Sequence, residues 1–152
     1  MAGMMGGMIG AQAAHQSAQA TAYGDNFQAG MEQQMFFQGM TKSFQTDTAM
    51  TQHLSSTIAN IEAVRASSGA SINSPSGDAV QNRVQGLGNQ DITRDVSNIQ
   101  QQAQMHLQAM AYYQHAAQDA ITAGDIAAEG AMMGGIASGF GQLTGMFGKM
   151  MG

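Results

Sequence analysis

The only proline of the 152-residue chain lies in a Ser- and Gly-rich run, residues 64–77, between two long stretches with a helical pattern. Such a run supplies the left-handed and capping conformations that a chain reversal needs. Ser74 followed by Pro75 is typical of the N-cap and the first residue of a new helix. We therefore expect a helical hairpin with its turn at residues 67–77. The residues expected to form this turn are Arg65, Ser68, Gly69, Ser74 and Pro75.

The composition provides little material for a core. Only 10% of the residues are charged and 43% are hydrophobic, and the chain has 15 Met, six Phe and no Trp. A monomeric hairpin of this composition can bury little large apolar area. We therefore expect an all-α fold whose faces are buried against other copies or other proteins. The expected assembly is a ring of many copies around an axial channel.

The charge and the cysteine content restrict the partners. The formal net charge is -5, and the five Lys and Arg residues are scattered, so no basic patch can neutralise many phosphates. We expect DNA to pass along the weakly charged, Gln-rich surface without sequence-specific binding. The chain has no Cys, and its first residues lack the basic region of a secretory signal peptide, so we expect synthesis in a cytosol.

Charge also divides the chain into three zones. These are an uncharged Gly/Met/Ala segment at 1–24, the helical hairpin at 25–123, and a Gly-rich apolar segment at 124–152. Glycines spaced four residues apart in the last zone allow helices to approach closely, above all in lipid. The glycines expected to pack helices in this way are Gly130, Gly134, Gly135, Gly139, Gly141 and Gly145.

The apolar side chains at the two ends are candidates for contact with a membrane or a partner. Residues 130–148 carry no charge and approach the ~20 residues that span a bilayer, but their glycines and polar residues make insertion conditional. Alternatively, both ends are flexible tails that fill protein grooves, with Met as an adaptable filler. The candidate contact residues are Met4, Met5, Met8, Ile9, Met132, Met133, Ile136, Phe140, Leu143, Met146 and Phe147.

Apolar residues in the central zone predict the seam between the two arms. In the second arm the stripe shifts by one position at Gly86-Leu87-Gly88. Two glycines in a helix interior cost about 2 kcal/mol relative to Ala, so we expect a kink there and a second arm made of two helical pieces. The seam residues expected in the first arm are Phe37, Met40, Phe44, Leu54, Ile58 and Ile61. Those expected in the second arm are Val80, Val84, Leu87, Ile92, Val96, Ile99, Ala103, Leu107 and Met110.

The sequence shows no set of residues typical of an enzyme. None of His15, His53, His106 and His115 belongs to a Glu-x-x-His or His-x-x-x-His pair, the patterns that place metal ligands on one helix face. No serine lies in a Gly-x-Ser-x-Gly motif. We therefore expect no catalysis, no metal and no cofactor.

Several segments resemble a known family. They are Ile58 to Gly69 with Ser74-Pro75-Ser76, the stretch Ala111 to Ala117 followed by Ala120 to Gly124, and Ile9 to Ala14. Together they are similar to internal virion proteins of tailed bacteriophages, especially the short-tailed, podovirus-like group. That resemblance implies storage in the capsid with other core, portal or tail proteins. It also implies ejection ahead of the genome and help in forming a channel in the host envelope.

Other functions remain open at this point. One is a structural virion component that lines the portal or tail channel without entering a membrane. Another is a small secreted helical hairpin of a bacterial secretion system, although the turn lacks the Trp-x-Gly motif of its best-known version. We favour the ejection protein, located in the virion and, after ejection, in the host cell envelope.

Overall fold

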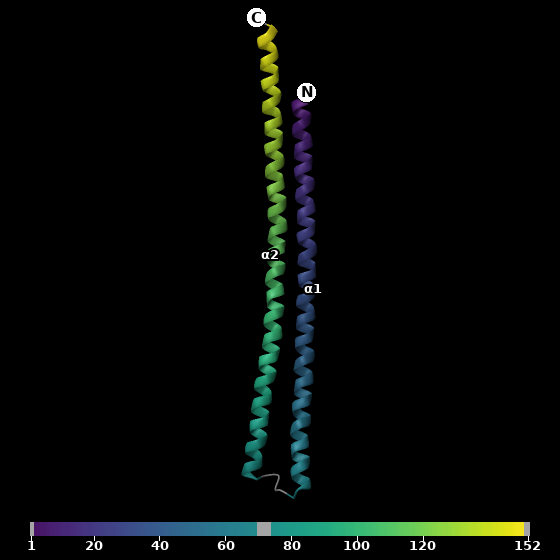
Figure 1. The fold of residues 1–152 in the computed structure, drawn as a ribbon, viewed down its shortest axis with the longest axis vertical. Helices are drawn as coiled ribbons and strands as arrows, with labels where there is room; N and C mark the ends of the chain where they lie inside the picture. The colour runs from purple at the N-terminus through teal and green to yellow at the C-terminus, as the bar shows by residue number, and fades with distance from the viewer. Residues whose placement is uncertain (1, 70–73, 151–152) are drawn as a thin grey trace. The chain divides into compact units, whose positions relative to one another are not determined.

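Two helices that pack against each other make up the described part of the protein, so the expected all-α hairpin is confirmed. The computed structural model describes residues 2–69 and 74–150, and side chains within 5–69 and 74–137. Helix α1 spans Ala2–Ser67 and helix α2 spans Pro75–Met150. Figure 1 shows α1 coloured from purple to teal and α2 from teal to yellow. These described residues contain no strand.

The contacts divide the hairpin into two compact units, and each is described by itself. The terminal unit comprises Met1–Glu32 with Ala109–Gly152, and the turn unit comprises Gln33–Gln108. Both expected end segments are helical where the structure describes them, since α1 begins at Ala2 and α2 continues to Met150. The described parts of both ends are therefore helical rather than irregular.

Helix α1 ends where its last carbonyls find local partners. The Ser68 amide donates to the Val64 carbonyl at 3.1 Å, and the Gly69 amide donates to the Ala66 carbonyl at 3.3 Å. Gly69 has a φ of 71°, a left-handed conformation that glycine adopts at the lowest cost. The helix therefore ends at Ser67 because the backbone reverses its handedness two residues later.

Helix α2 begins with Ser74 at its N-cap. The Ser74 carbonyl accepts from the Gly77 amide at 2.9 Å and from the Asp78 amide at 3.1 Å. The Ser74 hydroxyl accepts from the Gly77 amide at 3.4 Å and from Arg65 Nη2 at 3.2 Å. Pro75 follows as the first helical residue, where its missing N–H costs no hydrogen bond. Arg65 thus ties the end of α1 to the start of α2.

The seam of the turn unit combines medium-sized apolar side chains with a few small residues. Leu54 and Ile61 of α1 and Ile92 of α2 are half-buried. Ser43 and Ala103, which are 2% and 1% exposed, are buried in this seam. The helices approach so closely here that a Cβ atom at Gly39 would lie 2.9 Å from the Ala103 Cβ.

Five of the expected seam residues in this unit lie outside the seam, among them Leu107, which is 42% exposed beside half-buried His106. Phe37 and Phe44 are 58% and 68% exposed, and half-buried Phe36 and buried Ser43 take their places. Likewise Val80 and Leu87 are 52% and 53% exposed, whereas Gln81 is half-buried and Gly88 contacts Leu54. Each displaced residue is a helical neighbour of the true seam position, rotated from it by about 100°.

The second arm is not broken into two pieces. Helix α2 continues without interruption through Gly86 and Gly88. A Cβ atom at Gly88 would lie 2.9 Å from Leu54 Cδ2, whereas a Cβ at Gly86 would have no neighbour within 4 Å. Gly88 is therefore a seam residue that makes room for Leu54, and packing keeps the helix intact despite the weak helix propensity of glycine.

These two glycines should respond in opposite ways to alanine. Gly86→Ala should raise the free energy of unfolding by about 1 kcal/mol, because it adds helix propensity without a clash. Gly88→Ala should lose that gain, since Leu54 must move aside and overpacking costs about 1–3 kcal/mol. Urea unfolding followed by circular dichroism measures both. Equal stabilisation by the two variants would contradict the placement of Gly88 in the seam.

Candidate functional site

The seam of the terminal unit is built almost entirely from alanine and glycine. Ala22 and Ala29 of α1 are 3% and 4% exposed, and Ala117 and Ala128 of α2 are 1% and 2% exposed. Gly124 is also buried, and a Cβ atom there would collide with the Ala18 side chain. Because the side chains are this small, the two backbones can approach closely along this unit.

The two backbones approach each other closely near the N-terminus of α1. A Cβ atom at Gly7 would lie 2.9 Å from the Ala131 carbonyl oxygen and 3.0 Å from the Gly135 Cα. One turn later, a Cβ at Gly10 would lie 3.5 Å from the Ala131 Cβ. Backbone therefore meets backbone at Gly7 and Gly135, and no side chain fits between them.

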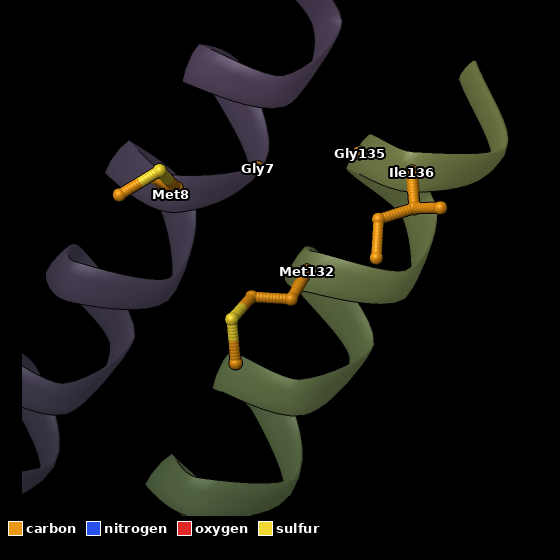
Figure 2. A pocket seen from close by; sticks show the side chains of 5 residues that line it. All are labelled: Gly7, Met8, Met132, Gly135 and Ile136. Atoms are coloured by element: carbon orange, nitrogen blue, oxygen red, sulfur yellow. The ribbon is translucent and has the colours of Figure 1, made fainter. Parts of the chain in front are cut away.

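An apolar pocket of about 170 Å³ lies beside this contact, lined by Gly7, Met8, Met132, Gly135 and Ile136. In Figure 2, Gly7 and Gly135 face each other across the two helices, and the Met132 and Ile136 side chains project from α2. Met8, Met132 and Ile136 are 69%, 47% and 46% exposed. The pocket is thus an open apolar depression that could receive a side chain or an acyl chain.

Most of the other predicted contact residues in the described range are also on the surface. Met5 and Ile9 are each 65% exposed, and Met133 is 72% exposed. The glycines differ among themselves: Gly130 and Gly134 have open space around them, whereas Gly135 packs within the hairpin. The remaining candidates lie outside the residues whose side chains are described, namely Met4, Gly139, Phe140, Gly141, Leu143, Gly145, Met146 and Phe147.

A polar contact between side chains joins the two helices of the terminal unit at its surface. His15 Nδ1 lies 3.3 Å from Asp125 Oδ1, and both side chains are about half exposed. Within residues 2–69 and 74–150, no group of three or more His, Asp or Glu side chains could hold a metal ion. In the same part of the chain, neither helix has a stretch long and apolar enough to cross a membrane.

Two features of the terminal unit escaped the sequence analysis. The first is the small-residue seam, although the alanines at 11, 14, 18, 22 and 29 already recur at helical steps in the sequence. The second is a pair of exposed aromatic residues, Tyr23 and Phe27, at 78% and 64% exposure. Alanine is a weaker indicator of a core than a large apolar residue, so its periodicity does not by itself predict this seam.

Comparison with known proteins adds no relative: no protein-family model, curated protein or solved structure matches the chain. The similarity to internal virion proteins therefore remains a hypothesis carried by the segments quoted from the sequence. The features of the structure that bear on function are the small-residue seam, the apolar depression beside it and the exposed apolar side chains.

Adjacent glycines at the start of α1 allow a direct test of the close approach. Gly6→Ala should stabilise the terminal unit by about 0.5–1 kcal/mol, since a Cβ at Gly6 meets nothing within 4 Å. Gly7→Ala should destabilise it, because the new Cβ meets backbone atoms, which cannot rotate away. Amide hydrogen exchange within residues 5–31 reports both effects. Faster exchange in Gly6→Ala than in Gly7→Ala would contradict the backbone contact.

Proposed function

We propose that this chain is an internal virion protein of short-tailed, podovirus-like bacteriophages that is ejected with the genome. In this proposal it helps to form a channel for DNA across the host cell envelope. The observation that carries the proposal is the inverted distribution of side chains in the hairpin. Alanine and glycine fill the terminal seam, whereas Met5, Ile9, Tyr23 and Phe27 face outward.

Ejection requires a protein that unfolds easily and refolds after passage. No large side chain of the described residues is fully buried, and the buried apolar residues are all alanines. Burial of apolar area is the main stabilising term in folding. Little stabilising free energy is therefore lost when a single hairpin of this kind unfolds. Its helices depend on local contacts, so they should re-form quickly once the chain emerges.

The exposed apolar side chains support an assembly of many copies. Contiguous apolar surface on a soluble protein is typical of contact with partners or membranes. In the proposal, copies form a ring within the virion together with core, portal or tail proteins, and the ring encloses DNA without reading its sequence. Contact with the host envelope follows after ejection.

The open surroundings of Gly134 make it the best position for testing lipid-dependent assembly. We expect the purified full-length chain to release dye from vesicles made of outer-membrane-like lipid. Gly134→Leu should reduce release severalfold, because the bulky side chain prevents close approach of another copy. It should leave the hairpin intact, since nothing lies within 4 Å of a Cβ at this position.

Gly86→Leu in the turn unit is the matched control, since a Cβ at Gly86 also meets nothing within 4 Å. Release that falls equally in both variants, or in neither, would refute the packing role of Gly134. If the unmodified chain neither binds nor permeabilises the vesicles, the channel proposal fails. The structural lining protein of the portal or tail would then be the better interpretation.

A further inference from the structure

The outer face of α1 in the terminal unit carries a stripe of large apolar side chains. We call Met5, Ile9, Tyr23, Phe27 and Met31 the outer stripe. Their side chains are between 44% and 78% exposed, with Tyr23 the most exposed. At 3.6 residues per turn, these positions fall on the side of α1 opposite the buried Ala11, Ala22 and Ala29. The stripe is therefore unused by the packing of α1 against α2.

The outer stripe is also free of charge. The charged residues of α1 in this region, Asp25 and Glu32, are half-buried on the seam side of the helix. His15 is directed to Asp125 of α2 through the polar contact at the surface. The chain as a whole has a formal net charge of -5, so a face without charge is where two copies can meet with the least repulsion.

We infer that the outer stripe binds the outer stripe of a second copy of this chain. A charged partner would find no ion-pairing group on this face, whereas a second copy offers the matching aromatic and Met side chains. Such composition, depleted in charge and rich in aromatic residues and Met, is typical of the centre of a protein interface. The resulting pair would be the building block of the proposed ring. This role in a ring rests on the proposed function.

The outer stripe supplies most of the area that such a contact needs. The exposed parts of its five side chains amount to roughly 600 Å², taking ~200 Å² for a whole aromatic side chain. Specific interfaces bury about 800 Å² per partner. The neutral side chains between Ile9 and Tyr23, which include Gln12, Gln16 and Ala20, can supply the rest. A two-fold contact of this kind is self-complementary, because the same surface contributes both halves.

The test is the oligomeric state of the full-length protein in lipid-free buffer, measured by analytical ultracentrifugation over a range of concentrations. We expect a dimer or a larger assembly. Tyr23→Glu and Phe27→Glu should each weaken self-association on the order of 100-fold, because they bring charges into a desolvated contact. Both side chains are exposed in the single chain, so helicity by circular dichroism should be unchanged.

Two exposed aromatic residues outside the stripe provide matched controls. Tyr112 is 69% exposed and Phe44 is 68% exposed, so Tyr112→Glu and Phe44→Glu add the same charge at similar exposure. The controls should associate like the unmodified chain. The inference is overturned if the unmodified chain is monomeric, or if the controls dissociate as readily as the stripe variants.

A photo-crosslinking amino acid in place of Phe27 gives an independent measurement. It should capture peptides from residues 5–31 of another copy, and capture confined to other parts of the chain would overturn the inference. Neither experiment uses lipid or phage particles. A failure of self-association is therefore distinguishable from a failure of the channel proposal, which the vesicle experiment tests.

Discussion

Close contact between two helix backbones is the constraint on which the rest of this structure depends. In the terminal unit, the Ala131 carbonyl oxygen and the Gly135 Cα leave no room for a Cβ at Gly7. A seam this narrow is filled mainly by alanine and glycine. Most larger apolar side chains of the same unit therefore lie elsewhere, as the exposed Tyr23 and Phe27 do. The surface chemistry follows from the seam.

The two units differ in how their seams stabilise them. Leu54, Ile61 and Ile92 contribute medium-sized side chains to the turn unit, although each is only half-buried. The terminal unit buries single methyl groups, each worth about 0.8 kcal/mol, at positions such as Ala117 and Ala128. Apolar burial between the two helices is thus smaller in the terminal unit than in the turn unit. Hydrogen bonds within each helix must supply most of the stability of the terminal unit.

The hairpin and its turn could be predicted from the sequence because turn chemistry is local. Ser74 caps α2 through its own carbonyl and hydroxyl groups, whatever packs nearby, and Pro75 follows as the first helical residue. The seam register could not be predicted in the same way, because large side chains were assumed to be inside. That assumption selected Leu87 instead of Gly88 and so created an apparent slip. Once Gly88 is placed against Leu54, the half-buried positions of α2 recur at steps of three or four residues through the same region.

The same assumption explains why the outer stripe was missed while the uncharged ends were noticed. Absence of charge in residues 5–24 has two structural origins in α1: a seam filled by alanine and glycine, and an outer face that includes Met5, Ile9 and Tyr23. Only the seam is covered within the hairpin, by the packing of α1 against α2. In an isolated chain the outer face of α1 is exposed to water, at a free-energy cost proportional to its apolar area. The proposed association would cover this face, whereas the thin seam inside each copy contributes little apolar burial to the single chain.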